Sequence, residues 1–222
     1  MLTPATLSSG LTLSDEDVVA RVLRGERELF EILMRRHNRR VFRTARAVVS
    51  NDAEAEDVMQ EAYVRAFEAL PRFEGRSSFA TWLTRIVINE GLTRRRRAPA
   101  GRFGDLEEAD AMSDPEQASP ERRTFDRELR ELLEHAVEAL SEPFRLVFVL
   151  RAVEQLSVRE VSESLGIPEE TVKTRYFRAR AQLRESLEEH ADAAAPGLYE
   201  FHLVRCDRVV DAVMKRLPGR DP

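Results

Sequence analysis

One stretch of the chain, residues 156–187, dictates two short helices with a tight turn between them. It reads LSVREVSESLGIPEETVKTRYFRARAQLRESL. Ser157 and Glu160 have the S-x-x-E spacing of a capping box, in which each side chain binds the other residue's backbone N–H. Gly166 permits the left-handed conformation that ends a helix, and Pro168 suits the start of the next one. Two short helices joined in this way predict a helix-turn-helix.

The second helix of this unit combines an apolar face with a basic one. Val172, Tyr176, Ala179 and Leu183 recur at helical spacing, and residues 168–184 hold five basic side chains against two acidic ones. Arginine and lysine reach guanine edges and phosphates, and aromatic groups can touch thymine methyls, so we predict a major-groove reader of duplex DNA. The alternative is an amphipathic hairpin whose arginines are merely solvated. The candidate DNA-reading residues are Lys173, Thr174, Arg175, Phe177, Arg178 and Arg180.

Composition favours helices elsewhere as well. Only 9 of the 222 residues are glycine, and long segments are rich in Ala, Glu, Arg and Leu, so we predict an all-α fold. Ser14, Ser78 and Ser141 are candidate N-caps of further helices. The single cysteine, Cys206, allows no internal disulfide, which suits a reducing cytoplasm. No run of about 18 apolar residues occurs, so no membrane-spanning helix is expected.

Sequence patterns of enzymes and metal sites are missing. We find no phosphate-binding glycine loop, no hydrolase nucleophile motif and no zinc-protease motif, so we expect no catalytic activity and no cofactor. His202 and Cys206 have the H-x-x-x-C spacing of a partial metal site, but position 209 is Val209 and a structural zinc site usually has four ligands. We therefore predict no metal site and interpret Cys206 as a small buried apolar residue.

Charge is segregated along the chain, although the net charge is only −5. Residues 21–46 hold nine Arg and three Glu, whereas residues 98–121 hold seven acids and one Arg. The acidic segment also contains three prolines and two glycines, which is typical of a flexible linker. The expected organisation is a flexible leader (1–13), a first helical domain (14–97), an acidic linker (98–121), a second helical domain with the helix-turn-helix (122–189), and an extension (190–222) with an amphipathic helix from about 200 to 217.

Residues 72–97 combine aromatic, hydroxyl and arginine side chains in the sequence RFEGRSSFATWLTRIVINEGLTRRRR. A serine-rich turn between aromatic residues suits single-stranded DNA, whose unpaired bases can stack, and arginines can hold the adjacent phosphates. The alternative is an ordinary helix, because Phe79, Trp82, Leu83 and Val87 also have core spacing. The candidate single-strand residues are Phe73, Arg76, Ser77, Ser78, Phe79, Trp82, Arg85, Asn89, Arg94 and Arg95.

A third candidate surface lies on the helix expected before Pro71. Asp57, Gln60, Glu61 and Val64 lie off the apolar stripe of this helix. An acidic, partly apolar face repels DNA, so we predict that it meets a protein with a basic surface. The alternative is a solvated helix face.

Two segments together resemble a known family. AEAEDVMQEAYVRAFEALPRFEGRSSFATWLTRIVINEGLTRRRR resembles region 2 of bacterial sigma factors, and LSEPFRLVFVLRAVEQLSVREVSESLGIPEETVKTRYFRARAQLRESL resembles their region 4. The layout is similar to that of the extracytoplasmic-function (ECF) group of the sigma-70 family. The resemblance implies a fold with a region 2 bundle and a region 4 helix-turn-helix, joined by the linker.

The resemblance also implies roles for the three surfaces. Asp57, Gln60 and Glu61 match the D-x-x-Q-E motif that docks on core RNA polymerase. Residues 73–79 match the loop that captures a flipped base of the promoter −10 element, with Trp82, Arg85 and Asn89 beside the melted strand. The linker resembles a segment that threads toward the polymerase active centre. Lys173, Thr174, Phe177 and Arg178 match the helix that reads the −35 element.

The expected function is therefore that of a cytoplasmic sigma factor, which binds core polymerase and directs promoter recognition, DNA melting and transcription initiation. An anti-sigma factor or another regulatory protein is a further expected partner. Two alternatives remain at this point: a stand-alone helix-turn-helix regulator of duplex DNA, and an interaction protein that sequesters a partner. The C-terminal helix is expected to dock within the monomer or on a regulator.

Overall fold

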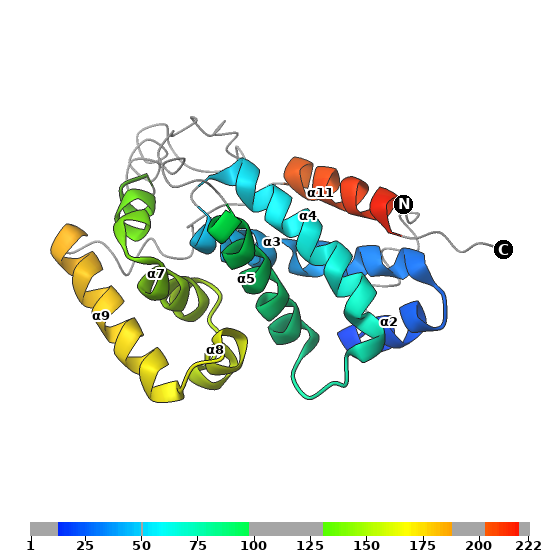
Figure 1. The fold of residues 1–222 in the computed structure, drawn as a ribbon, viewed down its shortest axis with the longest axis horizontal. Helices are drawn as coiled ribbons and strands as arrows, with labels where there is room; N and C mark the ends of the chain where they lie inside the picture. Colours follow the sequence, from blue (N-terminus) through cyan, green and yellow to red (C-terminus); the bar gives the residue numbers. More distant parts are fainter. Residues whose placement is uncertain (1–12, 50, 98–130, 188–202, 218–222) are drawn as a thin grey trace, which may run out of the picture.

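The chain is described by a computed structural model that covers residues 13–49, 51–97, 131–187 and 203–217, with the backbone alone described at 187 and 203–207. Every regular element in these ranges is helical and none is a strand, which confirms the predicted all-α class (Figure 1). Residues 1–12 of the expected leader and the whole acidic linker lie outside the described residues. None of the described helices is both long and apolar enough to span a membrane.

The first half of the molecule is a bundle in which α3, α4 and α5 pack against one another in pairs. Ser14 and Asn51 cap two of its helices, because their side chains accept hydrogen bonds from the backbone N–H groups of Asp17 and Glu54. The elements are α2 (Asp15–Leu23), η1 (Arg27–Leu29), α3 (Phe30–Val48), α4 (Asp52–Ala69), η2 (Leu70–Arg72) and α5 (Phe79–Arg97).

The second half contains the predicted helix-turn-helix. The capping box of Ser157 and Glu160 is present in full, and Gly166 ends the first helix in the left-handed conformation with φ of 65°. Ser141 occupies the predicted N-cap position of α7, but its side chain makes no capping hydrogen bond. The elements are a helix over 131–139, α7 (Glu142–Phe148), the π-helical η3 (Val149–Val153), α8 (Val158–Leu165) and α9 (Glu169–Leu187).

The two halves pack directly on each other, which the sequence did not predict. α5 lies against α8, and α3 lies against α7. At the centre of this contact the buried guanidinium of Arg145 donates to the carbonyl oxygens of Ala47 (2.8 Å) and Glu138 (2.9 Å). Arg46 also pairs with Glu138 across the contact, and Arg43 lies 3.3 Å from Glu154.

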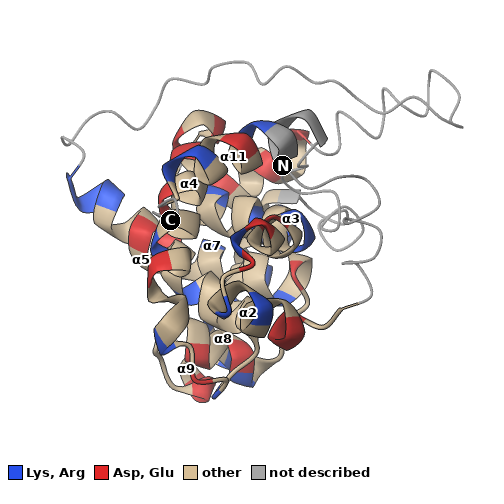
Figure 2. Cartoon of the chain, turned by 90° about the vertical axis from the view of Figure 1, so that its right-hand side faces the viewer, with Lys and Arg blue, Asp and Glu red and all other residues tan. Residues whose placement is uncertain are grey.

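The last helix, α11 (Leu203–Arg216), docks on the first half of the molecule. Figures 1 and 2 both show it beside α4, and it also contacts α3. Its inward side chains, including Val209, Val210, Val213 and Leu217, are buried. The prediction that this helix docks within the monomer is therefore confirmed.

Candidate nucleic-acid and polymerase interfaces

The outward face of α9 carries the predicted DNA-reading residues. Val172, Ala179 and Leu183 are buried and anchor the helix, as its apolar periodicity predicted. On the opposite side Phe177 is 75% exposed, which is unusual for a large aromatic residue in a folded chain. Lys173, Thr174 and Arg178 are exposed, whereas Arg175 and Arg180 are half-buried. The four exposed side chains lie on the outward side of α9, and the two half-buried arginines lie at its edges.

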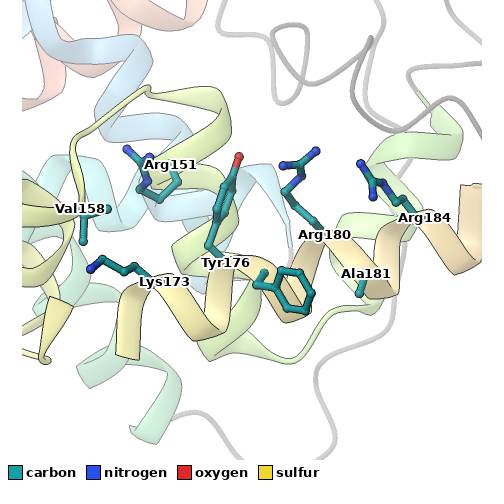
Figure 3. A pocket seen from close by; sticks show the side chains of 8 residues that line it. Arg151, Val158, Lys173, Tyr176, Arg180, Ala181 and Arg184 are labelled. Atoms are coloured by element: carbon teal, nitrogen blue, oxygen red, sulfur yellow. The ribbon is translucent and has the colours of Figure 1, made fainter. Parts of the chain in front are cut away.

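An open, cationic groove runs along one flank of α9 (Figure 3). Lys173, Arg180 and Arg184 line it from α9, and Arg151 reaches it from η3. The guanidinium carbons of Arg151 and Arg180 lie 5.6 and 5.8 Å from the ring centroid of Tyr176, which is within cation–π range. Several positive groups gathered along one exposed helix suit the phosphates of a DNA backbone.

Sequence reasoning missed Arg151 and Arg184 as members of this groove. Arg151 lies in the π-helical η3, which directly follows α7, and its guanidinium reaches the ring of Tyr176. No local sequence pattern predicts a π-helical turn. The position of Arg151 within an apolar run does, however, indicate that this side chain has a special role.

A second groove lies on the other flank of α9. Its lining includes Phe144, Thr174, Arg175 and Arg178. The Thr174 hydroxyl donates to the carbonyl oxygen of Glu170 at 2.9 Å, so it is already oriented along the helix. The hydrogen bond from Lys173 to Glu170 raises the pKa of the Lys173 ammonium, so this side chain keeps its positive charge at neutral pH.

The aromatic residues of the segment 72–97 pack on one another. Ring centroids lie 5.9 Å apart for Phe73 and Phe79, 5.1 Å for Phe73 and Trp82, and 5.6 Å for Phe79 and Trp82. Phe79 is fully buried and also contacts His37, so in this conformation it supports the cluster from beneath and is closed to a base. Phe73 and Trp82 are half-buried and keep part of their surface accessible.

The polar turn before α5 is exposed. Gly75 has φ of 68°, in the region that favours glycine, and the neighbouring Arg76 pairs with Glu74. The Ser78 hydroxyl accepts from the Thr81 N–H at 3.2 Å, which confirms the predicted N-cap. Ser77 is half-buried on this turn, and the predicted residues Arg85 and Asn89 are exposed on α5.

The arginines at the end of α5 are helical to Arg97. They form the basic end of α5 visible in Figure 2. Arg94 donates to Asp57 at 2.6 Å, and Arg95 pairs with Glu142 of α7. Two predicted DNA-binding arginines are thus neutralised by carboxylates of this chain, one of which belongs to the predicted polymerase-binding set.

The acidic face of α4 is only partly open. Asp57 is exposed, while Gln60 and Glu61 are partly covered. Val64 is 8% exposed, so it is not the surface residue that the sequence predicted. Glu61 pairs with Arg216 of α11 and Arg65 of α4. Hydrogen bonding from Arg216 lowers the pKa of the Glu61 carboxyl despite the opposing effect of burial, so this residue is ionised at neutral pH.

Metal chemistry has no visible site in the structure. Within the described ranges, no group of three His, Cys, Asp or Glu side chains is arranged to hold an ion. His202 lies outside those ranges, and for Cys206 only the backbone is described.

Comparison with known proteins decides the family. The model named Sigma-70 region 2 matches residues 33–100, and the model named Sigma-70, region 4 matches residues 130–183. The ECF RNA polymerase sigma-E factor of Escherichia coli (strain K12) is 34% identical over 176 residues, which cover 76% of this chain and 91% of that protein. The chain belongs to the ECF group of the sigma-70 family.

Other relatives of this sigma factor agree. The RNA polymerase sigma-H factor of Pseudomonas aeruginosa is 33% identical over 183 residues, covering 78% of this chain and 94% of the relative. The structure of CnrH in complex with the cytosolic domain of CnrY matches with a TM-score of 0.58 at 26% identity, over 78% of this chain and 97% of that one. The sigma factor RpoE in complex with the anti-sigma factor NepR, from Bartonella quintana, shares the fold (TM-score 0.54, 24% identity, 76% and 98% coverage).

Family membership fixes the general function. The protein is a sigma factor, a non-catalytic subunit that directs RNA polymerase to promoters and to transcription initiation. This result excludes the stand-alone regulator and the sequestering protein considered above. The region 2 match spans α4 and α5, and the region 4 match spans α7 to α9. α11 lies beyond both matched regions.

Proposed function

We propose that three surfaces of this sigma factor divide the work of initiation, with α9 reading the duplex −35 element. The carrying observation is the outward face of α9, where the exposed Phe177 stands among Lys173, Thr174 and Arg178. In this proposal Arg178 makes a bidentate contact with a guanine, and Phe177 makes an apolar contact with a thymine methyl. The grooves on both flanks add Arg151, Arg175, Arg180 and Arg184 as phosphate contacts that set the register on the duplex.

The acidic face of α4 is the proposed contact with core polymerase. Asp57, Gln60 and Glu61 follow the family motif, and their net negative charge suits a basic protein surface. Val64 lies on the same side of the helix and would add an apolar centre once it is uncovered, since it is buried in this conformation. Charged rim and apolar centre together are the usual anatomy of a specific protein interface.

The turn before α5 and the outer side of α5 are the proposed contact with the −10 element. Arg76, Ser77 and Ser78 offer donors on an exposed turn, and Phe73 and Trp82 offer partly accessible rings for stacking. Phe79 would hold these rings in place from below unless the cluster opens. Capture of an unpaired base would stabilise the melted strand, while Arg85, Asn89, Arg94 and Arg95 lie along the same helix.

The location and partners of the protein follow from this role. We place it in the cytoplasm, where the polymerase and promoter DNA are. The acidic linker is proposed to run toward the polymerase active centre. A regulator such as an anti-sigma factor is a further proposed partner, since the related CnrH was solved with the cytosolic domain of CnrY.

The −35 assignment is tested by substituting Arg178 in the holoenzyme. Arg178→Ala should weaken promoter binding by about 1–3 kcal/mol and flatten the response to base changes within the −35 element. Arg24→Ala, at the exposed arginine that follows α2, is the matched control and should leave both unchanged, because α2 lies far from α9 in Figure 1. If Arg178→Ala binds every −35 variant as the wild type does, Arg178 makes no base contact.

A further inference from the structure

The C-terminal helix α11 is an addition to the two matched sigma regions. The region 4 match ends at residue 183, whereas α11 begins at Leu203. The helix nevertheless packs on α4 and α3 of the region 2 bundle. Val209, Val210 and Val213 are each fully buried, so the contact has an apolar core rather than a loose surface association. One side of α4 is thus covered by α11 of the same chain.

Polar contacts fix α11 at both ends of this interface. Arg208 pairs with Glu56 near the start of α4, and Arg216 pairs with Glu61 one and a half turns further along α4. Arg27 of η1 donates to the carbonyl oxygen of Met214 at 2.8 Å, at the C-terminal end of α11 where a cation favours the helix dipole. These contacts define a single register of α11 on the bundle.

The side of α4 that α11 occupies overlaps the face assigned above to core polymerase. Glu61 belongs to that face and is held by Arg216. Val64 lies on the same side as Gln60 by helical spacing, yet it is only 8% exposed, and we attribute its burial to α11. While α11 is docked, Val64 is covered and the Glu61 carboxylate is already engaged by Arg216, so both are less available to a second protein.

We propose that α11 is an intramolecular competitor of core polymerase for the acidic face of α4, and that this sigma factor is autoinhibited until α11 is displaced. The inference rests on the proposed role of α4. The chemistry supports it, because α11 presents Arg216 to Glu61, one of the carboxylates that a basic polymerase surface would contact. α11 therefore stands in for the charge of the partner as well as covering the apolar centre.

The first test breaks the α11 contact by charge reversal in the full-length chain. Arg216→Glu places a carboxylate against Glu61 and should weaken the docking of α11, whereas Lys215→Glu makes the same change in net charge at the adjacent exposed position. Because the ion pair is partly exposed and the apolar core of the contact is unchanged, we expect binding to core polymerase to tighten by about 3- to 10-fold. Lys215→Glu should bind as the wild type does.

The outcomes separate this inference from the proposed function. Affinity for core that is equal in Arg216→Glu and wild type, or weaker in Arg216→Glu, would overturn autoinhibition; the weaker result would make α11 part of the binding surface. Asp57→Asn, tested in the Arg216→Glu background, examines the role of α4 itself. If this second change leaves core binding intact, the proposed polymerase face is wrong, whatever α11 does.

A second measurement uses the unaltered protein and does not depend on how a variant folds. Hydrogen–deuterium exchange of peptides from α11 is compared between the free sigma factor and its complex with saturating core polymerase. Competition predicts that α11 loses protection in the complex while α4 remains protected. α11 amides that stay equally protected in the complex would contradict displacement.

Discussion

Arg145 is buried where the two halves of the sigma factor meet, and its removal should weaken the contact between them. Its guanidinium is 8% exposed and donates to Ala47, in the last turn of α3, and to Glu138, in the last turn of the helix over 131–139. Carbonyl groups in the last turn of a helix have no partner within the helix, and a cation favours this end of the helix dipole. Arg145 therefore caps one helix from each half.

Arg145→Ala removes both donors at once. Each buried carbonyl left without a partner costs about 1–3 kcal/mol, and water entering the vacated space recovers part of this. We expect the contact between the halves to weaken by about 2–4 kcal/mol. Arg159→Ala is the control, because Arg159 is exposed and pairs only with Glu163 of its own helix α8 among the contacts of the described residues; it should cost less than about 0.5 kcal/mol.

Native-state hydrogen exchange measures this weakening locally. Amides in the last turn of α3 and in the helix over 131–139 should exchange roughly 30- to 700-fold faster in Arg145→Ala, since about 1.4 kcal/mol corresponds to a factor of ten. Amides in the middle of α4 should be unaffected. Acceleration of less than about fivefold at both helix ends would refute the argument that Arg145 holds the halves together.

Two further predictions concern the region 2 bundle. A Cβ added at Gly91 would lie 2.9 Å from Cγ1 of Val48. Gly91→Ala should therefore lower the free energy of unfolding, measured with denaturant, by about 1 kcal/mol, because overpacking outweighs the gain in helix propensity. A variant more stable than the wild type would contradict this prediction. Burial raises the pKa of Asp15, but the hydrogen bonds with His37 and Arg36 outweigh it and hold the pKa of this carboxyl below its ordinary value. The ionised Asp15 carboxylate thus contributes its full stabilisation above the unfolded-state pKa and loses it as pH falls through the lower folded-state pKa. The free energies of unfolding of wild type and Asp15→Asn should therefore converge as pH falls between these two pKa values; a difference that stays constant with pH would contradict this prediction.

The local structure of the helix-turn-helix was predictable because its signals are local. Ser157 and Glu160 lie three residues apart, and Gly166 directly follows the helix that it ends. The outward face of α9 was predictable for the same reason, since helical spacing places Val172 and Ala179 inside and Phe177 outside. The docking of α11 followed from an apolar stripe that had to be buried somewhere.

Features that depend on contacts between distant segments were not predictable. Arg145 stands beside Phe144 and Leu146 in an apolar run, and only the approach of α3 explains why a buried arginine is tolerated there. The predicted exposure of Val64 is wrong, because helical spacing within α4 carries no information about the packing of the distant α11 against it. The groove of α9 depends on a π-helical turn at Arg151, for which the sequence has no known signature.

The central claim is that this chain confers promoter-specific initiation on core polymerase, and a reconstituted transcription reaction tests it most directly. Core enzyme from the source organism would be combined with the sigma factor and fragmented genomic DNA, and the 5′ ends of the transcripts would be mapped. Arg216→Glu would be run in parallel so that autoinhibition does not hide activity. We predict discrete start sites that share −35 and −10 sequences and that require the sigma factor. If neither the wild-type sigma factor nor Arg216→Glu changes the transcripts made by core polymerase alone, the account is contradicted.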